Sequence, residues 1–274
     1  MLMEYIDEVH YINELEVSIT DNCHLNCDNC GFNVPKQPYP SNSTDTIEEM
    51  CKGLEYLDKL NIRIKTLVVL GGEPSFHSEK LLEAIERFAK FQHIDFIELV
   101  THGLSPQNIE PKVLKLINKL SISVYFDSEK LILLWKKYIA TFYTNVDLDF
   151  RVNKKWDRWL GDMIVSDKEA QKIFDDCWYK KHCITLERSK LFICSRIAKL
   201  GLDNEGLDIN QNTTIIQVEK YLNKIDFLNA CKNCIPMMKI EKIEAGKQPD
   251  NRILKMLPLA VGYLTEVLNT DEKI

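Results

Sequence analysis

The sequence predicts an α/β protein built on a parallel sheet, because strand-like and helix-like segments alternate over its first 150 residues. Apolar runs or alternating patterns typical of strands occur at residues 15–20, 65–70, 96–103, 121–127 and 145–152. Segments with apolar residues at helical spacing lie between them, at 45–60, 80–91, 111–120 and 129–140. Strands that alternate with helices in this way form βαβ units, and the strands of such units are parallel.

Composition restricts the class of protein. The chain has 274 residues, 45% of them hydrophobic, which is enough for one large domain or a domain with a small appendage. Its net charge of -6 comes without a basic block, so no nucleic-acid surface is expected. No apolar run reaches the roughly 18 residues of a membrane helix, and residues 1–14 lack a signal-peptide pattern. We therefore expect a cytoplasmic protein that binds neither nucleic acid nor membrane.

Cysteine is abundant, with nine residues, and eight of them form two groups. The groups occupy positions 23, 27 and 30, and positions 177, 183, 194, 231 and 234. Cytosolic thiols stay reduced, so such groups more often bind metal than form disulfides. The ninth, Cys51, lies on the apolar face of a predicted helix and is expected in the core.

The first group has the spacing C-x3-C-x2-C in CHLNCDNC, residues 23–30, directly after the strand-like residues 15–20. A [4Fe-4S] cluster held by three thiolates keeps one iron free to bind a small molecule. A zinc site is the alternative, but structural zinc takes four protein ligands and no fourth cysteine is near in sequence.

Other polar residues stand at the ends of the next three predicted strands: GGEP at 71–74, Thr101-His102-Gly103, and Ser123 with Asp127. In parallel α/β barrels the functional residues gather at the C-terminal ends of the strands. The sequence therefore predicts one site made by the cysteine loop, residues 21–32, and these residues. The structural alternatives are a simple turn for GGEP, a buried His102, and a helix cap for Asp127.

These motifs resemble those of the radical SAM superfamily. CHLNCDNC is similar to its CxxxCxxC signature, and GGEP to its second motif at the end of the second strand. The resemblance implies a partial (β/α)6 TIM-like barrel of parallel strands over residues 1–160. It also implies that Cys23, Cys27 and Cys30 hold a [4Fe-4S] cluster whose open iron binds S-adenosylmethionine (SAM).

The resemblance assigns SAM contacts to the second motif. Gly71 and Gly72 let the backbone approach the ligand, Glu73 accepts a hydrogen bond from the SAM ammonium group, and Pro74 fixes the turn.

The resemblance also assigns contacts with the SAM ribose or the substrate to residues at the ends of the later strands. Thr101 and His102 stand where many relatives carry a polar-Asn-Gly turn near the ribose, and Ser123 and Asp127 end the next strand. One position departs from the pattern: Asn29 replaces an aromatic residue that usually lies against the adenine. Phe32 or the backbone would have to supply that contact.

The second cysteine group lies in a predicted C-terminal unit. Cys183 and Cys194 bracket a predicted hairpin that turns near 188–190, and Cys231 and Cys234 form a CxxC. The four could form a zinc ribbon.

The order of barrel, hairpin and CxxC resembles the twitch domain, the shortened relative of the SPASM domain. That resemblance implies a small α+β iron–sulfur domain over 161–245, with one auxiliary [4Fe-4S] cluster. Ser189 replaces a glycine usual in SPASM hairpins. Residues 246–274 form a helical tail, in which the amphipathic segment 251–268 is expected to break at Pro258.

Two features remain open at this level. Cys177 is an alternative ligand to Cys183, a hydrogen donor to a product radical, or a buried packing thiol. Trp156 and Trp159 flank Arg158 after the fifth strand, and this segment either walls the substrate cavity or packs between the two domains.

The resemblance implies an enzyme of oxidoreductase or epimerase type. It would cleave SAM reductively to a 5′-deoxyadenosyl radical that abstracts hydrogen from a C–H bond of a small polar, sugar- or cyclitol-like substrate. A small substrate is favoured because the first predicted strand begins near residue 15, which leaves no room for a leader-binding domain. The alternatives are a maturase of a ribosomally made peptide and a non-catalytic zinc or iron–sulfur scaffold. The expected partner is an electron donor such as flavodoxin or ferredoxin.

Overall fold

Six parallel strands form the centre of the computed structural model, which describes residues 3–6, 9–32, 46–125, 129–152, 154–159 and 163–271. Their order is β8-β2-β3-β4-β5-β6. Their bounds are Val9–Ser18 (β2), Ile62–Leu70 (β3), Ile94–Thr101 (β4), Lys119–Val124 (β5), Asp147–Val152 (β6) and Ile184–Glu187 (β8). The prediction of five strands in parallel βαβ order is therefore confirmed by β2 to β6.

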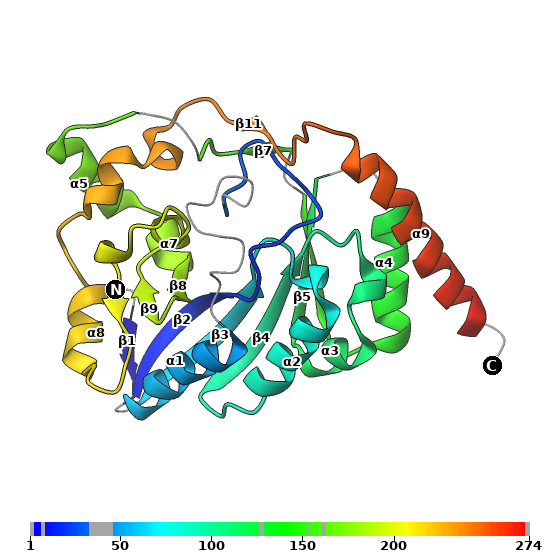
Figure 1. Cartoon of the computed structure of the whole chain (residues 1–274), viewed down its shortest axis with the longest axis horizontal. Coiled ribbons are helices and arrows are strands. Elements are labelled where there is room, and N and C mark those ends of the chain that lie inside the picture. Colours follow the sequence, from blue (N-terminus) through cyan, green and yellow to red (C-terminus); the bar gives the residue numbers. More distant parts are fainter. Residues whose placement is uncertain are drawn as a thin grey trace.

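Helices follow these strands as the apolar spacing predicted. They are α1 (Ile47–Lys59), α2 (Ser78–Phe88), α3 (Pro111–Leu116) and α4 (Glu129–Phe142). The Thr46 side chain accepts from the backbone of Glu49, whose carboxylate bonds back, so a capping box starts α1. In Figure 1, α1, α2 and α3 lie along the same face of the sheet. Cys51 is buried in α1, as expected.

The predicted hairpin is present and extends this same sheet. β8 pairs antiparallel with β9 (Lys190–Phe192), and β9 with β10 (Leu207–Asp208). Arg188 and Ser189 both have positive φ, 52° and 54°, as a two-residue type I′ turn requires. Ser189 therefore occupies a left-handed position that suits glycine.

Because β8 pairs in parallel with β2, the hairpin is not a separate sheet. The fold is a mixed α/β architecture with one large, mostly parallel sheet. A second buried cluster, which includes Phe174, Phe192 and Leu228, lies apart from the main core. The predicted division into domains near residue 160 stays a prediction.

The remaining elements surround the ends of the sheet. They are β1 (Met3–Ile6), which pairs antiparallel with β2, β7 (Lys155–Trp156) paired with β11 (Ile243–Glu244), α5 (Asp167–Asp176), α6 (Tyr179–His182), α7 (Ser195–Lys199), α8 (Ile215–Leu222) and α9 (Arg252–Asp271). Figure 1 shows α5, α7 and α8 at the end of the sheet where β8 and β9 lie, and α9 beside α4 at the other end.

The tail is helical as predicted, but the expected break at Pro258 is wrong. α9 runs through Pro258, because its apolar side continues beyond the proline and buries Ala260 and Leu264. This burial offsets the backbone hydrogen bond that proline cannot make. Among the residues that the structure describes, no helix combines the length and apolar character needed to cross a bilayer.

Candidate active site

A cavity of about 270 Å³ opens at the C-terminal ends of the parallel strands. It is lined by nine of the residues predicted for the first site: Cys23, Cys27, Cys30, Gly71, Gly72, Glu73, Thr101, His102 and Ser123. Pro74 is buried at the start of a short 3₁₀ turn and does not line the cavity. Asp127 lies outside the described residues. The structure thus brings three separate motifs to one place.

The three cysteines have the chemistry of ligands for a cationic group. Burial raises the pKa of Cys27 to about 12. Burial, and then the nearby Glu73 carboxylate, also raises the pKa of Cys23. Neighbouring buried thiols of this kind ionise when a metal group compensates their charge. An iron–sulfur cluster fits this donor set and the space beside it. Within the described ranges, no three His, Cys, Asp or Glu side chains are grouped closely enough to hold a single metal ion.

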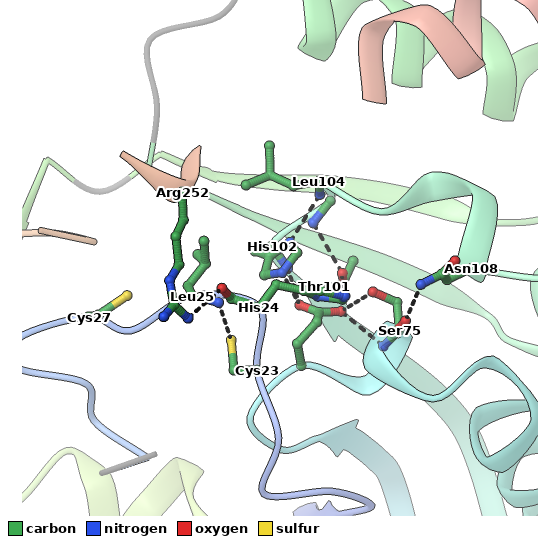
Figure 2. A network of polar contacts seen from close by, with 12 residues as sticks. Cys23, His24, Leu25, Cys27, Ser75, Thr101, His102, Leu104, Asn108 and Arg252 are labelled. Atoms are coloured by element: carbon green, nitrogen blue, oxygen red, sulfur yellow. Dashed lines mark hydrogen bonds and ion pairs between the residues drawn. The ribbon is translucent and has the colours of Figure 1, made fainter. Parts of the chain in front are cut away.

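Glu73 of GGEP joins this motif to the Thr101–Gly103 turn through hydrogen bonds. Its Oε1 accepts from the Ser75 backbone N (3.0 Å) and Oγ (2.6 Å) and from Thr101 Oγ1 (2.6 Å). Its Oε2 accepts from the His102 backbone N at 2.8 Å. Figure 2 shows Ser75, Thr101 and His102 gathered in this network. Burial alone would raise the pKa of Glu73, but the nearby His102 and these hydrogen bonds outweigh it and lower the pKa.

This network fixes the Glu73 carboxylate in place. An ionised carboxylate offers about four acceptor sites, and here Oε1 accepts from three protein donors while Oε2 accepts from one. The structure therefore gives Glu73 a positioning role at the rim of the cavity. Its predicted bond to the SAM ammonium group stays a prediction.

Gly71 and Gly72 are required by the cysteine loop itself. A Cβ on Gly71, whose φ is 153°, would lie 2.4 Å from the Thr20 carbonyl oxygen. A Cβ on Gly72 would lie 2.3 Å from the carbonyl oxygen of Asn22. The Gly72 N–H donates to Thr20 O at 2.8 Å and the Glu73 N–H to Asn22 O at 2.7 Å. Both glycines therefore allow a close approach to the cysteine loop, and they also line the cavity. Their predicted approach to SAM stays a prediction.

His102 is buried beside Glu73. Its Nδ1 accepts from the Leu104 backbone N at 3.0 Å, which leaves the proton on Nε2. That nitrogen lies 3.4 Å from Glu73 Oε2 and has no hydrogen-bond partner in the part of the chain that the structure describes. Burial is the main cause that lowers the pKa of His102. Its predicted contact with SAM stays a prediction.

Aromatic side chains form one wall of the cavity. Trp156 and Trp159 both line it, which favours the cavity-wall interpretation of their segment. The Trp156 ring meets Tyr125 edge to face at 4.8 Å. A Cβ on Gly31 would lie 3.0 Å from the Trp159 indole, so Trp159 covers the cysteine loop closely. Phe32 also lines the cavity, as its expected place near the adenine requires.

Two charged lining residues escaped sequence reasoning. Glu16 of β2 is buried, and burial raises its pKa to about 7. Its Oε2 accepts from Thr185 Oγ1 at 3.2 Å, and the Cys183 thiol also bonds to it. Arg151 of β6 also lines the cavity and pairs with Glu98. The alternating strand LEVSIT contained a signal for Glu16: a charge two residues before Ser18, at the end that carries the cysteine loop.

The second cysteine group gathers in a different combination from the expected one. A small cavity of about 20 Å³ is lined by Cys177, Cys194, Cys231 and Cys234. Cys183 does not line it and bonds to Glu16, although Cys194 is near enough to help raise the pKa of Cys183 after burial and Glu16. Among the alternatives for Cys177, its place beside the other three thiols favours the ligand role.

Cations lie next to this second group. Lys180 and Arg196 also line the small cavity. Arg196 lies over the CxxC segment and donates to the Asn233 carbonyl oxygen at 2.6 Å. Burial raises the pKa of Cys231 to about 11, while Arg196 opposes the effect of burial at Cys234.

Comparisons with known proteins match the chain in part. No family model matches it. Among curated proteins, it is similar to GTP 3′,8-cyclase of two strains of Staphylococcus epidermidis, with 30% identity over 100 residues. The match covers 34% of this chain and 28% of each relative, so the chain spans less than a third of the relatives' length.

Solved structures show a weaker likeness. They include a histidine-tagged form of anSMEcpe with bound AdoMet (15% identity, TM-score 0.45, 95% of this chain and 99% of that chain). Native anSMEcpe with bound AdoMet and Kp18Cys peptide has 15% identity and a TM-score of 0.44, over 96% of this chain and 100% of that chain. Streptococcus suis SuiB bound to S-adenosylmethionine has 15% identity and a TM-score of 0.36, over 77% of this chain and 64% of that chain. TM-scores below 0.5 are too low to establish a common fold.

Proposed function

We propose that this protein is a radical SAM enzyme in which Cys23, Cys27 and Cys30 hold a [4Fe-4S] cluster and the open iron binds SAM. The observation that carries the proposal is the single cavity where the C-x3-C-x2-C loop, GGEP and the Thr101–Gly103 turn meet at successive strand ends. A metal scaffold would need the thiols but not the other two motifs. The partial match to GTP 3′,8-cyclase is in keeping with an enzyme.

The chain's own residues prepare the cavity for a cofactor. When bound, SAM with the reduced cluster supplies a 5′-deoxyadenosyl radical that abstracts hydrogen from a substrate C–H bond. Glu73 fixes the rim through bonds to Ser75, Thr101 and His102. Trp156 and Trp159 exclude water and offer flat apolar surfaces, which would serve the adenine in place of the aromatic side chain missing at Asn29.

The second thiol group is proposed to hold an auxiliary [4Fe-4S] cluster through Cys177, Cys194, Cys231 and Cys234. A four-thiolate cluster would supply a one-electron acceptor, which suits an oxidation. The volume of about 20 Å³ is too small for a four-iron cluster, and within the described ranges no three of these thiols are grouped closely enough for a single ion, so either group would require the thiols to rearrange. Zinc takes the same ligands, so it is the second candidate at this site.

The substrate is proposed to be a small polar molecule, with sugars and cyclitols as examples. The substrate would share the cavity of about 270 Å³ with the cluster and SAM, which favours a small molecule. Glu16, Arg151 and Ser123 supply polar groups on its wall. With a pKa near 7, Glu16 is suited to accept a proton as the substrate is oxidised. The reductant would be a flavodoxin or ferredoxin.

The test is iron, sulfide and zinc content after anaerobic reconstitution, with 5′-deoxyadenosine followed after addition of SAM and dithionite. We expect about eight irons per chain for two clusters and formation of 5′-deoxyadenosine. A Cys23/Cys27/Cys30→Ala variant should retain about four irons and form none. Four irons with one zinc would assign zinc to the second site. A reconstituted protein without iron or SAM cleavage would refute the proposal.

Candidate substrates can be separated with the same assay. Deuterium placed at a C–H bond of a sugar, a cyclitol or a short peptide should appear in 5′-deoxyadenosine only when that compound is a substrate. Transfer from a peptide alone would replace the small-molecule proposal with the peptide alternative.

A further inference from the structure

The chain returns to the cysteine loop through residues 246–252, more than 200 positions later in the sequence. Three contacts join this segment to the backbone of the loop: Asp28 N to Lys247 O at 3.0 Å, Asn26 N to Gln248 Oε1 at 2.7 Å, and Arg252 Nη1 to His24 O at 3.1 Å. Figure 2 shows Arg252 reaching the loop beside His24 and Leu25. The segment therefore holds the loop along its length.

The fourth contact reaches a cysteine sulfur. Gln248 Nε2 donates to Cys27 Sγ at 2.8 Å and to the Gly246 carbonyl oxygen at 2.9 Å. Because Oε1 is taken by the Asn26 N–H, the amide has only one orientation that satisfies all its neighbours. Gln248 is thus locked with its N–H groups toward the thiol.

The segment is itself fixed to the cavity wall. β11 pairs with β7, with Ile243 opposite Trp156. Gly246 has φ 64°, and a Cβ there would lie 2.4 Å from Tyr125 Cβ. A single stretch of chain therefore contacts both the aromatic wall and the cysteine loop.

We propose that Gln248 is a positioning residue that clasps the cysteine loop, and that its bond to Cys27 raises the reduction potential of the cluster held there. The second half rests on the proposed function, since it requires a cluster on Cys27. A donor on a ligand thiolate withdraws electron density from the sulfur. The reduced cluster carries one more negative charge, so it gains more from this donor than the oxidised cluster does.

Hydrogen exchange in the metal-free protein tests the clasp without any cluster. Gln248→Leu removes both the acceptor for Asn26 and the donor to Cys27. We expect the amides of residues 24–28 to exchange about tenfold faster in this variant, as the loss of about 1.4 kcal/mol of local hydrogen bonding would give. Gln92→Leu, at an exposed position away from the site, is the control and should leave these amides unchanged. Equal exchange in Gln248→Leu and wild type would overturn the positioning role.

A redox titration followed by electron paramagnetic resonance tests the effect on the cluster. The signal that changes on addition of SAM identifies the first cluster. At a fixed potential, the ratio of reduced to oxidised cluster should fall about tenfold in Gln248→Leu, equivalent to 59 mV for one electron. Gln248→Glu keeps the acceptor for Asn26 but places a carboxylate beside the thiolate, so its ratio should fall further.

The outcomes separate the two proposals. Wild-type ratios in both Gln248 variants, at equal iron content, would overturn the effect on potential. A wild-type protein that binds no iron would refute the proposed function and this effect with it, while hydrogen exchange still decides the clasp.

Discussion

The two thiol sites differ in what surrounds the sulfurs. The first opens into a cavity of about 270 Å³ that is also lined by a buried carboxylate, a histidine and two tryptophans. The second has about 20 Å³ of free space, lined by apolar side chains such as Phe174, Ile193 and Ile197 and by Lys180 and Arg196. Three cysteines with room beside them suit a metal group that binds another molecule, whereas four cysteines with little free space suit one that does not. The number of ligands and the free space therefore lead to the same assignment.

The largest expected effect is the loss of SAM cleavage when a cysteine of the first site is removed. Cys27→Ala should abolish 5′-deoxyadenosine formation and remove roughly half of the iron, since one of two four-iron clusters is lost. Cys51→Ala is the matched control, because Cys51 is buried in α1 and faces neither site. Iron analysis measures the cluster content of both variants, and the SAM cleavage assay measures their activity. Full activity in Cys27→Ala would remove the catalytic role of the first site.

A second pair of variants tests which cysteines form the second site. Cys177→Ala should lose the metal of that site, because Cys177 lines the small cavity with three other thiols. Cys183→Ala should keep it, because Cys183 contacts Glu16. Metal content per chain distinguishes them. The reverse result would restore the ligand set expected from the hairpin spacing.

Glu16 lines the open site and also bonds to Cys183, so its titration reports on a buried charge of the first site. Burial raises its pKa to about 7 in the folded protein, whereas the unfolded value is about 4.3. The stability associated with its protonated form is complete below the unfolded pKa and is lost as pH rises through 7. Glu16→Gln should therefore be more stable than wild type at pH 8, by up to about 3 kcal/mol, and similar to it at pH 4. Urea unfolding of the metal-free proteins at both pH values would show it, and a pH-independent difference would contradict the raised pKa.

The smallest effect compares two glycines. Gly72→Ala places a Cβ 2.3 Å from the Asn22 carbonyl oxygen and should destabilise the fold by about 2 kcal/mol. Gly262→Ala, in α9 with no atom within 4 Å of the new Cβ, should stabilise it by about 0.5–1 kcal/mol. Thermal unfolding of the metal-free variants should show a lower Tm for Gly72→Ala and a higher Tm for Gly262→Ala. Equal changes in Tm would mean that the backbone around Gly72 relaxes to accept a Cβ without a loss of stability.

Local sequence patterns were sufficient to predict the parallel strands and to predict that the motifs lie close together. The apolar run at 65–70 and the alternation at 145–152 both became parallel strands, and strand ends brought GGEP beside the cysteine loop. This works because a parallel sheet places every strand's carboxyl end at one edge.

Contacts between distant segments were not predictable in the same way. Nothing local in residues 184–187 indicates that they pair with β2, and this pairing is what draws Cys183 to Glu16. The bond from Gln248 to Cys27 joins residues 221 positions apart. Local propensity also failed at Pro258, where packing of the later residues of α9 continues the helix.

The pairing of β8 with β2 has a consequence for synthesis of the chain. Glu16 and Thr185 are 169 positions apart, so residues 15–17 of β2, beyond its pairing with β1, wait for their partner until most of the protein has left the ribosome. An unpaired central strand is a template for intermolecular association, and closing so long a loop slows folding. A truncated chain that ends near residue 160 would carry the complete cysteine motif on an exposed sheet edge, and aggregation would be its characteristic failure.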